Sequence, residues 1–179
     1  IKKAAGELGN VDYEQITYEG YAPGGVAVIV ETITDNRNRT ASDIRHCFAK
    51  FGGNMGTTGS VSFMFDEKGV LVVEREPGSD EDEMMMMALE AGAEDVKVDE
   101  DAFEIYTAPN DLTAVREALE KQGISSFLTA EVQMIPQNTV AVEGENLEAV
   151  QKMLDLFDEY DDVQEAFHNA ELPEEEDEE

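Results

Sequence analysis

The chain has 179 residues and a formal net charge of −30, because 42 acidic residues stand against 12 basic ones. With 41% hydrophobic residues it can bury a core, but no apolar run approaches the roughly 18 residues of a membrane span, and no signal-peptide core is visible. The single cysteine, Cys47, rules out an internal disulfide framework and fits a reducing compartment. We therefore expect a cytoplasmic protein, or one of the mitochondrial matrix if it is eukaryotic.

The acidic surface should repel phosphate backbones and anionic membranes. High solubility or adaptation to a salty habitat explains this charge equally well. The sequence starts with Ile1, and residues 1–5 look like the end of a helix stopped by Gly6, so we expect a fragment. For this reason the total charge is no argument against nucleic-acid binding by the intact protein.

The first elements follow from apolar spacing. Residues 7–19 look like a connector, and residues 23–25 form a Pro/Gly turn before a β-branched strand at 26–34. After a polar loop at 35–39 we expect a helix that starts at Thr40, with Asp43 completing a capping box. Its buried stripe consists of Ala41, Ile44, Phe48 and Phe51, and Gly52 with Gly53 ends it.

In the middle of the chain we expect a β-hairpin followed by a domain boundary. Residues 61–65 and 70–73 are predicted as two strands joined by a turn at 66–69. The Pro-Gly-Ser sequence at 77–79 is the best boundary signal in the chain.

The following segments alternate between helix and strand. We expect helices at 80–91, 110–122 and 147–160, and strands at 94–98, 103–107, 127–135, 139–142 and 163–167. The four methionines at 84–87 cannot all face inward. Two of them are either an adaptable contact surface or, as we favour, covered by other segments.

This order predicts an α+β protein with two two-layer α/β sandwich, ferredoxin-like domains, one inserted into the other. The outer domain should comprise residues 1–78 and 136–170, and the inserted domain residues 79–135. Residues 171–179 hold seven acids in nine positions and are predicted to be a disordered acidic tail.

One basic cluster interrupts the acidic sequence. Between residues 36 and 62 a single acid, Asp43, accompanies four basic residues, which are Arg37, Arg39, Arg45 and Lys50. We expect Arg37 and Arg39 in the loop before the helix. Arg39, Asp43, His46 and Lys50 should lie on one side of the helix, away from its buried stripe. These residues could contact phosphate oxygens, or the helix could simply have a solvated basic face; we weigh the two equally.

The adjacent glycine-rich loop includes Gly52, Gly53, Asn54 and Gly56. It lacks the lysine and the strand-to-helix setting of a phosphate-binding P-loop, so a surface loop that contacts a macromolecular partner is the remaining functional interpretation. His46 and Cys47 diverge by about 100° on a helix, which favours a buried cysteine over an activated one. No zinc-ligand spacing or catalytic constellation is visible, so we expect no enzyme activity, no metal and no cofactor.

Several segments together resemble the YebC/PmpR family of gene-expression regulators. The resemblance is carried by YEGYAPGGVA at 18–27, NRNRT at 36–40, FGGN at 51–54, EAGAED at 90–95 and DDVQ at 161–164. It implies the second and third of three domains, with the small basic helical first domain missing from this sequence.

The resemblance also implies a non-enzymatic role. Family members are described as DNA-binding transcriptional regulators, and others, including a mitochondrial translational activator, act as ribosome-associated translation factors. The expected partners are therefore DNA or the ribosome and its RNA, reached mainly through the missing domain, and no membrane. The alternative is an acidic interaction module that binds a basic protein.

Overall fold

The computed structural model describes residues 12–173, and in these residues the chain divides into two units. The first unit comprises residues up to Phe65 and from Pro136 onward, and the second comprises Asp66–Ile135. The first boundary therefore lies at residue 66 and not at residue 79, because the strand that precedes the Pro-Gly-Ser turn belongs to the second unit. No helix in the described part of the chain is long and apolar enough to cross a membrane.

The first unit is built on a four-stranded sheet with the order β3-β1-β2-β9. Its strands are β1 (Glu14–Ala22), β2 (Val26–Thr34), β3 (Asn54–Met55) and β9 (Val163–His168). The predicted connector at 7–19 is wrong from residue 14 onward: this stretch pairs with β2 over nine residues in an antiparallel hairpin. Its polar residues hid this strand from the sequence analysis, because six of the nine positions in β1 are only partly buried or exposed.

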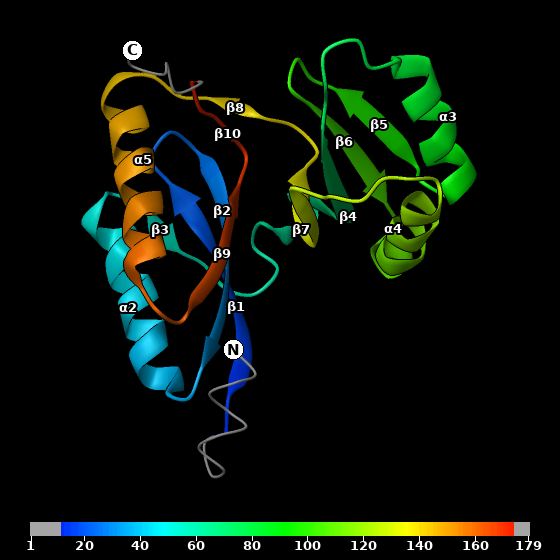
Figure 1. Cartoon of the computed structure of the whole chain (residues 1–179). Helices are drawn as coiled ribbons and strands as arrows, with labels where there is room; N and C mark the ends of the chain where they lie inside the picture. Colours follow the sequence, from blue (N-terminus) through cyan, green and yellow to red (C-terminus); the bar gives the residue numbers. More distant parts are fainter. Residues whose placement is uncertain (1–11, 174–179) are drawn as a thin grey trace. The chain divides into compact units, whose positions relative to one another are not determined.

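Two helices, α2 (Arg37–Lys50) and α5 (Gly144–Glu159), cover the same face of this sheet (Figure 1). Val28 and Val30 of β2 pack against Ile44 and Phe48 of α2 and against Phe157 of α5. The rings of Phe48 and Phe157 meet edge to face, with centroids 5.4 Å apart. This contact fixes the two helices side by side.

The C-terminal segment closes the first unit. Strand β10 (Ala170–Glu171) pairs in parallel with β8 (Val140–Ala141), so ordered structure reaches beyond the expected end at residue 170. The side-chain oxygen of buried Asn169 accepts a 2.8 Å hydrogen bond from the Ala27 amide of β2. The rest of the predicted acidic tail, residues 174–179, and the predicted helix end at 1–5 lie outside the described residues.

The second unit has the ferredoxin-like order of elements. These are β4 (Phe65–Glu74), α3 (Glu81–Ala91), β5 (Asp95–Val98), β6 (Ala102–Thr107), the short helix η2 (Pro109–Asp111), α4 (Leu112–Lys121) and β7 (Thr129–Pro136). The sheet order is β5-β6-β4-β7, as a βαββαβ unit requires. Leu71, Ile105, Val115 and Leu119 form the core between the sheet and the helices α3 and α4.

The predicted hairpin at 61–73 is wrong. A single 3₁₀ turn, η1 (Ser62–Met64), precedes one continuous strand, β4, which runs through the expected turn at 66–69. Gly69 lies inside this strand because it is paired with Thr107, whose hydroxyl occupies the space that a Cβ at residue 69 would need.

The fold class expected from the sequence is confirmed: both units are two-layer α/β sandwiches, and the second interrupts the chain of the first. The first unit, however, begins with the β1–β2 hairpin. Its order of elements therefore differs from the βαββαβ order of the second unit.

Candidate functional site

Helix α2 begins three residues earlier than the sequence suggests. Asn36 is its N-cap, and the Asn36 side chain accepts a hydrogen bond from the Arg39 amide. Arg37 and Arg39 therefore lie in the first helical turn and not in a preceding loop. No acid accompanies them there, although the positive end of the helix dipole favours acids at this place.

Acids from other segments compensate for these two arginines. Arg37 forms a 2.8 Å ion pair with Glu14 of β1, and both side chains are at least half exposed. Arg39 pairs with Asp162 at 3.0 Å and with Asp35 at 3.2 Å. These contacts raise the pKa of both guanidinium groups, so both stay charged at any physiological pH.

Asp162 links three elements of the first unit. Its carboxylate accepts hydrogen bonds from the Thr40 hydroxyl at 2.8 Å and the Thr34 hydroxyl at 3.4 Å. The Thr40 hydroxyl also lies 2.7 Å from that of Thr34. Thr40 is thus a buried residue inside α2, not its cap, and Arg39 is held at the edge of a hydrogen-bonded network.

Arg45 and Lys50 differ from the two arginines at the helix start. Both are exposed, and neither forms an ion pair with an acid within residues 12–173. Lys50 lies 5.6 Å from the centre of the Phe51 ring. It borders an open hollow of about 520 Å³ between α2 and α5, which is also lined by Glu145 and by the Lys152–Glu148 ion pair.

The four basic residues do not form one stripe. At about 100° per residue, Arg39 and Lys50 lie on one side of α2, about 16 Å apart along its axis, whereas Arg37 and Arg45 lie on another side. Burial raises the pKa of Tyr18 in β1, and both Arg37 and Arg45 oppose this rise. Arg37 and Arg45 therefore both interact electrostatically with strand β1.

The glycine-rich loop is attached to the sheet. Its Asn54 and Met55 form the edge strand β3, which pairs with Tyr21 and Gly20 of β1. A side chain at Gly53 would place its Cβ 2.3 Å from the Tyr21 carbonyl oxygen, and one at Gly20 would place it 2.6 Å from that of Asn54. The glycines therefore permit close approach of two backbones.

Glu19 organises the next part of this loop. The residue is 4% exposed, and its carboxylate accepts hydrogen bonds from the amides of Gly59 (2.6 Å), Val61 (3.1 Å) and Ser62 (2.6 Å). Burial alone would raise the pKa of Glu19, but these donors lower it below its ordinary value. A charged carboxylate thus holds the loop that leads out of β3.

The remaining polar candidates offer no reactive group. Cys47 is fully buried, and burial raises the pKa of its thiol to about 12. Burial lowers the pKa of His168, whose Nδ1 accepts a hydrogen bond from the Ala170 amide. Residues 12–173 contain no group of three His, Cys, Asp or Glu side chains placed to hold a metal ion.

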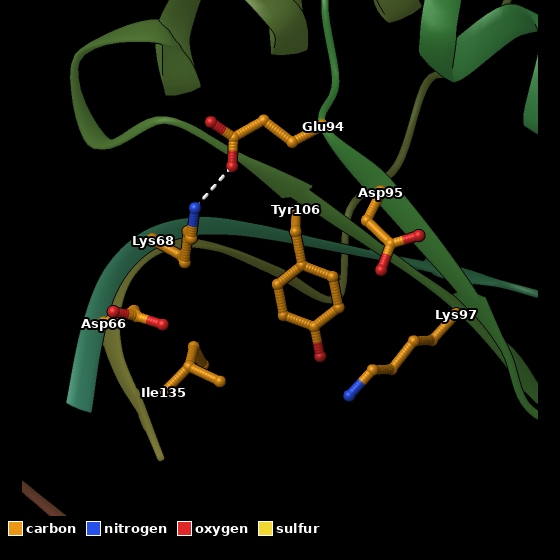
Figure 2. A pocket seen from close by; sticks show the side chains of 7 residues that line it. All are labelled: Asp66, Lys68, Glu94, Asp95, Lys97, Tyr106 and Ile135. Carbon is orange, nitrogen blue, oxygen red and sulfur yellow. Dashed lines mark hydrogen bonds and ion pairs between the residues drawn. The ribbon is translucent and has the colours of Figure 1, made fainter. Parts of the chain in front are cut away.

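A separate pocket of about 240 Å³ lies in the second unit, on the strands β4, β5 and β6 (Figure 2). Tyr106 points into it, flanked by Lys97, whose Nζ lies 5.3 Å from the ring centre, and by the Lys68–Glu94 ion pair at 2.5 Å. Burial and a 2.8 Å hydrogen bond to Glu104 raise the pKa of Tyr106, and the hydrogen bond to Glu94 raises that of Lys68. Both groups therefore stay protonated and can serve neither as base nor as nucleophile.

Comparison with known proteins identifies the family. Residues 13–170 match the family described as the TACO1/YebC second and third domain. The chain belongs to this family. A Clostridium beijerinckii protein named "probable transcriptional regulatory protein" is 60% identical over 174 residues, which cover 97% of this chain and 70% of that protein. A Clostridium novyi protein with a similar name is 58% identical over 98% of this chain and 71% of its own length.

A solved structure shares the fold of this TACO1/YebC chain. The crystal structure of a conserved hypothetical protein from Aquifex aeolicus is 46% identical and superposes with a TM-score of 0.84. The match covers all of this chain and 73% of that protein.

The segments that carry the family resemblance can be located in the secondary structure. The stretch at 18–27 contains the end of β1, the β1–β2 turn and the start of β2. The stretch at 36–40 forms the start of α2, and that at 161–164 forms the turn into β9. Sequence reasoning assigned no role to Glu19 and Asp162, although both lie within these stretches. Their backbone and side-chain partners are 40 and 122 residues away, so spacing along the sequence could not reveal them.

Proposed function

We propose that this TACO1/YebC chain works, without enzymatic chemistry, as a regulator of gene expression that contacts the phosphate backbone of DNA or of ribosomal RNA through α2. The observation that supports the proposal most strongly is the state of Arg45 and Lys50. They are exposed, and no acid within residues 12–173 forms an ion pair with them, although the chain has a net charge of −30. The names of the Clostridium relatives agree with a regulatory role.

The arginines at the helix start contribute to different degrees. The Arg37–Glu14 pair is exposed, and exposed pairs are worth at most about 1 kcal/mol, so a phosphate can replace Glu14. Arg39 is held more firmly, because its partner Asp162 is only 21% exposed and is bound to Thr40 as well. We therefore assign phosphate contacts to Arg45, Lys50 and Arg37, and a mainly structural role to Arg39.

The salt dependence of binding by the full-length protein tests this proposal. Each phosphate contact to duplex DNA contributes about −0.9 to the slope of log K against log salt concentration. Arg45→Ala with Lys50→Ala should therefore make the slope less steep by about 1.8. Running the same series with promoter DNA and with ribosomes separates the two classes of target.

Arg116→Ala with Lys121→Ala is the matched control, since it removes two positive charges from α4 in the second unit. This control should leave the slope unchanged. An unchanged slope for the α2 variant with both targets would contradict the proposal. An equal change in slope for the α2 variant and the α4 control would mean that the effect comes only from the net charge of the protein.

A further inference from the structure

Helix α3 presents apolar side chains to solvent, although four acids lie on the same helix. Met85, Met86 and Leu89 are 39%, 63% and 57% exposed. The expectation that other segments cover these methionines is therefore wrong. Met84 and Met87 pack against the core together with buried Ala88, so the helix has one apolar side toward the core and a second one toward solvent.

Acids surround this exposed apolar face. Glu81, Asp82, Glu83 and Glu90 lie on α3 itself, and the helix contains no basic residue. Residues 66–135 as a whole carry 19 acidic and 5 basic side chains. An occupant of this face must therefore combine apolar contacts with positive charge.

A hollow of about 240 Å³ lies beside the first half of the same helix. Four acids line it, which are Glu74, Glu76, Asp80 and Glu83, together with the apolar side chains of Met84, Met87 and Phe103. This combination suits the long side chain of a lysine or arginine, whose stem packs on methionine while its charged end meets carboxylates.

We propose that the exposed face of α3 binds a basic amphipathic α-helix of a protein partner. Met85 and Leu89, one turn apart, form a ridge that packs between the side chains of a second helix. Unbranched methionines adapt to the shape of such a partner. A second copy of this chain does not fit, because two α3 faces would bring at least eight carboxylates together with no basic residue of α3 between them.

The probe for this proposal is a fluorescein-labelled designed helix of about 18 residues, with leucines along one face and lysines along the other. Its affinity for the full-length protein is measured by fluorescence anisotropy. Met86→Gln with Leu89→Gln should weaken binding about tenfold or more, as loss of central apolar contacts does. Leu128→Gln, at a side chain of similar exposure (62%) in the same unit, should leave the affinity unchanged.

A second variant tests the charge independently of the apolar contacts. Glu83→Gln with Glu90→Gln should weaken binding and reduce its salt dependence, because both side chains are exposed and border the apolar face. Circular dichroism verifies that each variant is folded.

Three results would overturn the proposal. A peptide of the same composition, scrambled so that its leucines share no face, could bind as tightly; this would indicate charge attraction alone. The M86Q/L89Q variant could bind like the parent protein. Finally, sedimentation could show a dimer of the parent that dissociates in this variant, which would make a second copy the occupant.

Discussion

Burial determines the chemistry of Cys47 at the scale of a single residue. The thiol lies between α2 and α5, with Sγ 3.7 Å from the Met153 carbonyl oxygen. Burial raises its pKa to about 12, although nearby Lys50 opposes this rise. The sequence-based expectation of a buried cysteine is therefore confirmed, and the neighbouring His46 remains exposed.

Cys47 should be inert toward thiol reagents at pH 8 in the folded protein, because a protonated and enclosed thiol is a poor nucleophile. Reaction with a chromogenic disulfide reagent should release less than a tenth of the expected colour before unfolding and the full amount in denaturant. Rapid labelling under native conditions would show that α2 and α5 separate readily.

Glu19 should make the free energy of unfolding depend on pH in the acidic range. Its pKa is lower in the folded protein than the ordinary 4.5, so the unfolded chain binds a proton first as the pH falls. The stabilisation is thus complete above pH 4.5 and is lost as the pH falls through the lower folded value. Urea unfolding of the parent between pH 7 and pH 3 should show this loss, and Glu19→Gln should show less of it.

At pH 7 Glu19→Gln should lower the free energy of unfolding by about 1–3 kcal/mol. The NH2 group of the glutamine side chain would face backbone N–H groups, so donors would meet donors without an acceptor. Glu14→Gln, at an exposed residue of the same strand, is the control and should have little effect. A Glu19→Gln variant as stable as the parent would mean that the loop at 59–62 does not need the carboxylate.

At the scale of elements, the start of α2 depends on a residue from the far end of the chain. Asp162, in the turn just before β9, accepts a hydrogen bond from the hydroxyl of Thr40 and forms an ion pair with Arg39. Local sequence pointed to Thr40 as the cap because it precedes an apolar stripe and a suitably spaced Asp43. The true cap, Asn36, leaves Thr40 free to bond Asp162, a contact that no local pattern contains.

Asp162→Ala should lower the free energy of unfolding by about 1–3 kcal/mol, because it leaves a buried hydroxyl with fewer partners and Arg39 with fewer acids. Asp161→Ala removes an equal charge from an exposed neighbour and should cost much less. Thermal denaturation of both variants provides the comparison. Equal losses would indicate that charge at this end of α5, and not the network, matters.

The strands show where local prediction succeeds. Strand β2 was predicted with its bounds because its core run is continuous and β-branched, as in a strand buried on both faces. The sequence does not reveal strand β1, because β1 is only partly buried and its extended conformation depends on its pairing with β2. The sequence divides strand β4 because Asp66, Lys68 and Gly69 together are typical of a turn, whereas the strand continues through them and Gly69 pairs with Thr107 of β6.

At the scale of the molecule, net charge is the dominant property. The 30 excess negative charges repel one another more strongly in the folded protein than in the expanded chain. Raising NaCl from 0.01 M to 1 M shortens the screening length from about 30 Å to about 3 Å. We expect the Tm at pH 7 to rise over this range.

Differential scanning calorimetry at several salt concentrations measures this shift. A Tm that falls with salt would show that ion pairs such as Arg75–Glu81 stabilise the fold more than the general repulsion destabilises it. The sequence alone could predict the acidity and the two sandwiches. It could not predict that Glu14 and Asp162 would pair with Arg37 and Arg39, because these acids lie 23 and 123 residues away, whereas no acid within residues 12–173 forms an ion pair with Arg45 or Lys50.

The pairing of β2 with β9 joins segments that lie more than 120 residues apart, with the whole second unit between them. During synthesis, β1, β2 and α2 leave the ribosome long before β9 and α5 can cover Val28, Val30 and Phe48. The second unit, whose elements are contiguous, can fold in this interval. The apolar surface of the first unit therefore stays exposed until α5 and β9 have been synthesised. A stalled or truncated chain that ends before residue 163 should for this reason be a substrate for chaperones and proteases.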